Sequence, residues 1–310
     1  MSRIFLRIIN VLNNRFTKKV YFYRPPTFWS AFEIKINILV QWAIKTVIDS
    51  GSNKVSLRTT KMISGTKKKK NALVLGNGPT VKNLNFVRVR ELKLIEELEI
   101  FTVNYGLLDE DIQNLEPNYL VLSDEMTMPN ALDERTTLLW KMVSGNKKIV
   151  VITPTSWHSK FDELKECKND SCLHFKDSSL EGISISTSPL RARGYSSMTT
   201  YKALAFAVHL GYSEIFCAGI DNSGFKSVEV NEHNHLIQNS RHLNETYMKS
   251  KDISVGYPNG MCDYLADYAS LFYTLRRCFE SKQIINLAID SELDVFRKIK
   301  REDSYFFLVN

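Results

Sequence analysis

Two kinds of hydrophobic pattern divide the chain. Apolar residues recur at helical spacing over residues 3–16, and a second amphipathic helix is predicted over residues 30–50, after the Pro25-Pro26 break. From residue 71 onward, short apolar runs alternate with helical patterns, which is typical of a mostly parallel β-sheet with helices on its faces. The apolar runs predict strands near residues 72–76, 100–104, 119–123, 148–153, 214–219 and 283–288. The pattern therefore predicts a single α/β domain over residues 71–310, preceded by an amphipathic helical N-terminal arm and linker over residues 1–70.

The basic residues are concentrated in this arm. Residues 1–70 hold 15 of the 41 Lys and Arg residues but only two of the 34 acidic residues, Glu33 and Asp49. The rest of the chain is net acidic, which argues against a nucleic-acid groove across the main domain. Neither helix of the arm offers about 18 uninterrupted apolar residues, so neither is expected to span a bilayer. Two interpretations stay open: residues 1–50 lie on an anionic membrane surface, or the second helix packs on the main domain.

The cysteines and the N-terminal sequence indicate a reducing compartment. The five cysteines are an odd number without the paired short spacings of a structural zinc site, and a Cys167–Cys172 disulfide is disfavoured because nothing else suggests export. Polar residues interrupt the apolar stretch after the basic start, so no cleavable signal peptide is predicted. We expect a cytoplasmic protein, peripheral at the inner face of the membrane, in which GTKKKKN (65–71) is a solvated linker.

Small and polar residues follow the predicted strands. In an open parallel sheet, ligands bind beyond the carboxyl ends of the strands, so these residues are the candidate site. They are Gly76, Asn77, Gly78, Pro79 and Thr80 after the first strand, Asn104 after the second, Ser123 and Asp124 after the third, and Gly219, Ile220 and Asp221 after the fifth. The first turn either brings backbone and helix-start N–H groups to an anionic ligand or is an ordinary strand-to-helix turn with Pro79 at the first helical position. Val81 replaces the third glycine of the GxGxxG motif, which disfavours a nicotinamide enzyme.

Two further segments carry candidate chemistry. GYSSMTT (194–200) precedes a predicted helix that ends at Gly211, and its hydroxyl groups either cap this helix or bind a phosphate or carboxylate. Asp-Glu-Asp at 109–111 formally matches the DxD motif of metal-dependent glycosyltransferases, but its position after the second strand indicates the cap of a helix start. No metal site is therefore predicted.

Three segments together indicate a protein family more specifically than any one of them does. LGNGPT (75–80), the strand that ends at Asn104 and SSMTTYKALAFAVHLGYSEIFCAGID (196–221) resemble the bacterial sialyltransferases of glycosyltransferase family 42 and the related central domain of flagellin-modifying motility accessory proteins. The resemblance covers roughly residues 71–290. It implies a single Rossmann-like domain that transfers a sugar, an acidic nonulosonic acid or a Kdo-type sugar, from a CMP-activated donor to a cell-surface glycan or glycolipid acceptor. It also implies inversion by a histidine base, without an essential metal or other cofactor.

The resemblance assigns a role to each matching residue. Gly76, Asn77, Gly78 and Thr80 would lie along the nucleotide; Asn104 would hydrogen-bond the ribose or phosphate; Ser197 and Thr199 would face the donor's phosphate or carboxylate; and Gly219, Ile220 and Asp221 would line the cytidine site. The family places tyrosines soon after its GID-like motif to hold the departing phosphate, whereas this chain has Asn222, Ser223 and Phe225 there. Phosphate stabilisation is therefore unassigned, with Tyr247 and Tyr257 in the same general region.

Histidines that follow the fifth predicted strand are the candidates for the base. The pattern over residues 228–237 predicts a β-hairpin with His233 at its exposed tip. His242 follows the return strand, where the chain is expected to come back toward the sheet, and it is favoured as the base; His235 is the second candidate. His158, His174 and His209 are expected to be packed or surface residues.

Two other functions stay open. A pterin or nucleotide pyrophosphokinase would have a related domain, but it would need a Mg²⁺-carboxylate site and a GxxxxGK[ST] phosphate loop, a motif that the sequence lacks. The second is a non-catalytic assembly protein that docks on membranes through residues 1–50.

Overall fold

The computed structural model describes residues 70–94, 97–129, 133–146, 148–154, 157, 172–175, 187, 198–240, 249–257, 260–279 and 284–310. The predicted N-terminal arm, apart from Lys70, lies outside these residues.

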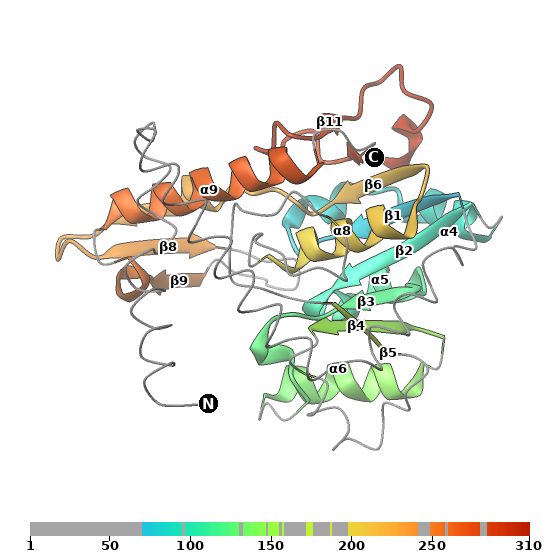
Figure 1. The fold of residues 1–310 in the computed structure, drawn as a ribbon, viewed down its shortest axis with the longest axis horizontal. Helices are drawn as coiled ribbons and strands as arrows, with labels where there is room; N and C mark the ends of the chain where they lie inside the picture. The colour runs from blue at the N-terminus through green and yellow to red at the C-terminus, as the bar shows by residue number, and fades with distance from the viewer. Residues whose placement is uncertain are drawn as a thin grey trace, which may run out of the picture.

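An eight-stranded sheet, in the order β11-β10-β6-β1-β2-β3-β4-β5, forms the centre of the described structure (Figure 1). Every pairing within this sheet is parallel. Its strands are β1 (Asn71–Leu75), β2 (Leu98–Val103), β3 (Tyr119–Val121), β4 (Val150–Pro154), β5 (Cys172–Phe175), β6 (Glu214–Ala218), β10 (Ile284–Asn286) and β11 (Arg297–Lys298). The predicted α/β fold with a mostly parallel sheet is confirmed, and all six predicted strands are present. β5 and β11 were not predicted.

Both faces of the sheet are buried, as its apolar strands require. Along β1, Ala72 and Val74 join the core on one face, while Leu73 and Leu75 join the core on the other. The helices that cover these faces lie in two layers (Figure 1). The first layer is α8 (Thr199–Leu210) and α9 (Met261–Phe279), and the second is α4 (Phe86–Leu94), α5 (Glu110–Asn114) and α6 (Glu134–Gly145). Short 3₁₀ helices are η1 (Pro79–Asn83), η2 (Asn104–Leu108), η3 (Glu125–Thr127), η5 (Gly224–Ser227), η6 (Ser254–Gly256) and η7 (Phe306–Leu308).

The helix α8 follows the sequence prediction closely. Its small residues Ala203, Ala205 and Ala207 are buried and let the helix pack on the sheet. The helix ends at Gly211, which adopts a left-handed conformation with φ of 77°. No helix among the described residues is long and apolar enough to span a membrane.

The direction of strand addition reverses at β1. β2, β3, β4 and β5 follow one another on one side of β1, whereas β6 pairs with its other side. In open parallel sheets, ligands bind in the crevice beyond the carboxyl ends of the strands at such a switch point. The turns after β1 and β6 are therefore the parts of the fold where a ligand is first expected.

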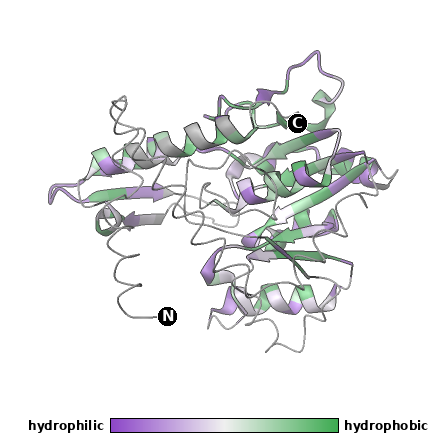
Figure 2. Cartoon of the chain, in the orientation of Figure 1, coloured by the Kyte–Doolittle hydropathy of each residue, from purple (hydrophilic) through white to green (hydrophobic). Residues whose placement is uncertain are grey.

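A smaller antiparallel sheet of β7 (Val228–Val230), β8 (Leu236–Ser240) and β9 (Lys249–Asp252) projects from the large one (Figure 1). β7 and β8 form the predicted hairpin, in which Val230 pairs with Leu236. Its tip is hydrophilic and lies at the end of the projection away from the large sheet (Figure 2). β9 was not predicted because its sequence, KSKD, has no apolar pattern.

Candidate functional site

The turn after β1 packs directly on the turn after β6. The Gly76 N–H donates to the Ala218 carbonyl over 2.8 Å, and the Gly78 N–H donates to the Gly219 carbonyl over 2.9 Å. A Cβ on Gly76 would lie 2.2 Å from the Gly219 oxygen, and one on Gly78 would lie 2.1 Å from Asp221 Oδ2. Contact between the two turns therefore accounts for both glycines.

Asp221 joins the two turns through Thr80. The Thr80 hydroxyl donates to Asp221 Oδ1, and the Thr80 N–H donates to Oδ2 over 3.3 Å. The Asp221 side chain is buried, and this burial raises its pKa, while the hydrogen bonds from Thr80 oppose the rise. Pro79 occupies the first turn of η1, as predicted. The N–H groups of Gly78, Thr80 and Val81 are all engaged in hydrogen bonds within the protein.

Three candidate residues meet in a polar cluster, which we call the Asn104–Ser123–Thr199 node. Asn104 Nδ2 donates to Thr199 Oγ1 over 3.1 Å, and Ser123 Oγ lies 2.7 Å from the same oxygen. These residues come from the end of β2, the end of β3 and the start of α8. The fold thus brings together side chains that are far apart in sequence, at the carboxyl edge of the sheet where the sequence predicted them.

Three buried oxygen atoms lack partners among the described residues, one in this node and two against Gly106. Asn77 Oδ1, Thr102 Oγ1 and Asn104 Oδ1 are buried and make no hydrogen bond with any described residue. Asn77 Oδ1 and Thr102 Oγ1 both lie against Gly106, 3.1 and 2.6 Å from the place where its Cβ would be. An unpaired buried polar group costs about 1–3 kcal/mol, so each of these oxygen atoms requires a hydrogen-bond donor from an ordered water or a ligand.

Thr102 was missed by the sequence reasoning. It is fully buried in β2, where its hydroxyl interrupts the apolar run IFTV. A hydroxyl residue within an apolar strand was the signal by which the sequence could have identified Thr102. Thr200 was considered only as part of its segment; its Oγ1 would lie 3.3 Å from a Cβ on Gly76, so the start of α8 adjoins the first turn.

The remaining candidates are placed differently. Asp124 is exposed and accepts a hydrogen bond from the Met126 N–H, which caps η3. Ile220 is buried in the core beneath the second turn. Ser197, His242, Tyr247 and His158 lie outside the described residues.

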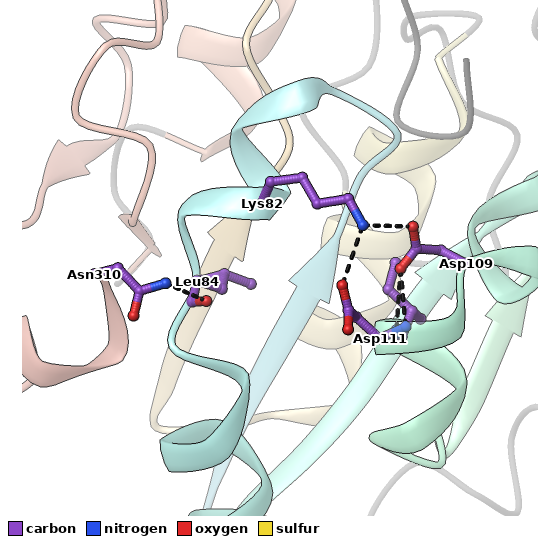
Figure 3. A network of polar contacts seen from close by, with 6 residues as sticks. Lys82, Leu84, Asp109, Asp111 and Asn310 are labelled. Atoms are coloured by element: carbon purple, nitrogen blue, oxygen red, sulfur yellow. Dashed lines mark hydrogen bonds and ion pairs between the residues drawn. The ribbon is translucent and has the colours of Figure 1, made fainter. Parts of the chain in front are cut away.

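The acidic residues at 109–111 cap a helix, as predicted. The Asp109 side chain accepts hydrogen bonds from the N–H groups of Asp111 and Ile112 at the start of α5. Lys82 Nζ lies 2.9 Å from Asp109 Oδ2 and 3.1 Å from Asp111 Oδ2 (Figure 3). Burial lowers the pKa of Lys82, but its bonds with the two carboxylates outweigh this effect and raise it. Within the described part of the chain, no group of three or more His, Cys, Asp or Glu side chains is arranged to hold a metal ion.

The hairpin histidines lie on the projecting sheet. His233 is exposed at the tip, as predicted. His235 is half-exposed beside the tip, and its Nδ1 lies 2.9 Å from Asp252 Oδ2. Hydrogen bonds from the Ser254 backbone and side chain, and then from His235, lower the pKa of Asp252. His235 directly precedes β8, and the hairpin tip lies away from the large sheet (Figure 1).

The other described histidines fit the expected structural roles. His174 is buried in β5, with its Nδ1 2.9 Å from Thr153 Oγ1. His209 lies in the last turn of α8, where its ring packs edge-on against Phe206.

No protein-family model matches the chain, and a search of curated proteins finds no match.

Proposed function

We propose that this chain is a glycosyltransferase that uses a nucleotide-activated sugar. The donor would be a CMP-activated nonulosonic acid or Kdo-type sugar, and the acceptor a cell-surface glycan or glycolipid. The observation that carries the proposal is the Asn104–Ser123–Thr199 node with its unpaired neighbours, at the carboxyl edge of the sheet near the β1–β6 switch point. Ribose hydroxyls and a base amine would supply the donors that these oxygen atoms need.

The start of α8 is the place where the donor's phosphate or carboxylate fits best. Met198 provides no side-chain cap for this helix, and the Thr199 hydroxyl is already engaged in the node. N–H groups in the first turn of a helix, together with the positive end of its dipole, attract anions. Such groups would stabilise the charge on departing CMP without requiring a metal.

His242 remains the proposed general base. An inverting transfer needs a group that removes the proton of the acceptor hydroxyl, and histidine suits this step because its unperturbed pKa is about 6.5. β8 runs antiparallel to β7, back from the tip, and ends at Ser240, two residues before His242. This order favours His242 over His235, which begins the return beside the tip.

Residues 1–50 would hold the enzyme at the inner face of a membrane, where lipid-linked glycans are assembled. Basic residues near an anionic surface contribute about 1 kcal/mol each, and salt screens this attraction. Protein shortened to begin near Ser64 should no longer sediment with anionic liposomes. If the full chain also does not sediment with anionic liposomes at low salt, the arm has a structural role and does not bind the membrane.

Nucleotide-dependent melting tests the proposal. At a concentration of 100 Kd, a ligand stabilises the folded state by about 2.7 kcal/mol, which corresponds to a rise in Tm of roughly 5–10 °C for a domain of this size. We expect CMP to produce this rise. A response to ATP with Mg²⁺ alone would favour the pyrophosphokinase, and no response would favour the assembly protein. Mass analysis of products from a panel of CMP-sugars would then identify the donor.

A further inference from the structure

Asn222 has an unusual combination of backbone and side-chain environments. It follows Asp221 in the turn after β6 and adopts a left-handed backbone with φ of 52°. The residue is 7% exposed, and both its Oδ1 and its Nδ2 are buried without a hydrogen-bond partner among the described residues. A buried amide that pairs neither its donor nor its acceptor is costly, so such a group in a folded protein requires an explanation.

The surrounding structure holds this turn in place. Ser291 Oγ donates to the Ile220 carbonyl over 2.7 Å, and the Glu292 N–H donates to the Asp221 carbonyl over 3.0 Å. Thr80 holds the Asp221 side chain from the other direction. The loop is therefore fixed up to Asn222, and an uncommon backbone conformation with an unpaired amide persists there. Features of this kind concentrate at ligand sites, where the surrounding fold imposes them.

Asparagines occur in the segments that follow three adjacent strands of the large sheet. β6, β1 and β2 are adjacent in the sheet, and they are followed by Asn222, Asn77 and Asn104 respectively. Each of the three has a buried Oδ1 that makes no hydrogen bond with the described residues, and Asn104 is also left-handed, with φ of 45°. Two of these strands, β6 and β1, meet at the switch point. Asn222 differs from the other two because its Nδ2 is buried and unpaired as well.

We infer that Asn222 determines specificity in this site by binding a neutral ligand edge that carries a donor and an acceptor side by side, namely the base of the nucleotide. A phosphate or carboxylate offers only acceptors and leaves Oδ1 unpaired, whereas an ammonium group offers only donors and leaves Nδ2 unpaired. The exocyclic amine and ring nitrogen of cytosine match both atoms of the amide. The inference rests on the proposed use of a nucleotide donor.

Calorimetric titration of the full chain tests this role. CMP and ribose 5-phosphate, which lacks the base, are titrated into wild-type protein and into Asn222→Gly. Glycine accepts a positive φ, so the substitution removes the amide without straining the backbone. The control is Asn234→Gly, at a left-handed position with φ of 59° in the hairpin turn. We expect Asn222→Gly to weaken CMP binding roughly tenfold to a hundredfold, as for loss of a bidentate pair to a base, while ribose 5-phosphate binds as before. The control should change neither.

Three other outcomes would overturn the inference. If the wild type binds CMP and Asn222→Gly binds it equally well, Asn222 is not a specificity residue, although the proposed function stands. Equal weakening of CMP and ribose 5-phosphate would mean that Asn222 only shapes the loop, which also overturns the inference. If wild-type protein binds no CMP, the proposed function fails and the inference fails with it. A second variant, Asn222→Asp, keeps the size of the side chain but loses the donor, and it should likewise weaken CMP binding. This variant tests the inference if Asn222→Gly does not fold.

Discussion

Replacing Gly78 with alanine separates packing of the two turns from contact with a ligand. The backbone of Gly78 has φ of −75° and ψ of 151°, which any residue adopts, so an added methyl group meets only a steric obstacle. It would lie 2.1 Å from Asp221 Oδ2 and 2.7 Å from the Gly219 carbonyl oxygen. The carboxylate is tied to Thr80 and the carbonyl is backbone, so neither moves freely.

The expected loss follows from this crowding. Inserting a methyl group into a closely packed site costs about 1–3 kcal/mol, and each kcal/mol lowers the Tm by about 2–4 °C in a domain of 150–250 residues. We therefore expect Gly78→Ala to melt roughly 2–12 °C below the wild type, with a matching loss in urea unfolding. CMP binding should weaken as a consequence of the displaced turn.

The matched control is Gly145→Ala at the end of α6, where an added Cβ would meet nothing within 4 Å. This variant should melt at or slightly above the wild-type temperature, because alanine lowers the entropy of the unfolded chain. The reasoning is refuted if Gly78→Ala is as stable as Gly145→Ala. In that case, a selective loss of CMP binding would show that Gly78 is needed for close approach of the ligand.

Three further predictions concern other parts of the structure. Burial raises the pKa of Asp221, so the folded state binds this proton more tightly than the unfolded state, and stability falls as pH rises from the ordinary pKa of about 4 through the raised one. Asp221→Asn should remove this fall, so the difference in unfolding free energy between the variant and the wild type should change between about pH 4 and pH 7. A constant difference in urea unfolding over this range would contradict the prediction. The Tyr212 hydroxyl donates to the buried carboxylate of Glu99, so Tyr212→Phe should cost about 1.5–3 kcal/mol of unfolding free energy. Adding Glu99→Gln should recover part of this loss. An unchanged melting curve for Tyr212→Phe would argue against this role of the hydrogen bond. His242→Ala should lower turnover about 10²- to 10⁴-fold with CMP affinity nearly unchanged, whereas His235→Ala should lower turnover little. The reverse pattern would make His235 the base. If neither substitution lowers turnover, the mechanism with a histidine base is wrong.

Apolar runs in the sequence were sufficient to predict six of the eight strands of the large sheet. The six predicted strands are buried, apolar runs, and parallel strands covered on both faces have this composition. The strands that were missed lack that signal: β9 is KSKD, and β11 has only two residues. β5 is a four-residue strand that includes His174, and its pairing with β4 depends on long-range contact that no local pattern reports.

The sequence predicted that several candidate residues lie at one edge of the sheet, but it did not predict the contacts between them. Topology brings strand ends together, so Asn104 and Ser123 could be grouped from the sequence, whereas Thr199 was a candidate through the family resemblance. Their hydrogen bonds could not be predicted, because these depend on side-chain geometry. The glycines of the first turn looked like ligand contacts, whereas Gly78 faces Asp221 of the second turn, and only the structure shows that packing.

Hydrogen exchange of the full chain with and without CMP tests most directly whether a nucleotide binds at the carboxyl edge of the sheet near the β1–β6 switch point. The four segments that should become protected are 76–81, 104–108, 199–203 and 219–223, because a ligand held there would order their backbone amides. The hairpin turn at 231–235 should exchange as before. Protection confined to that turn, or no protection at CMP concentrations that raise the Tm, would contradict the site proposed for this protein.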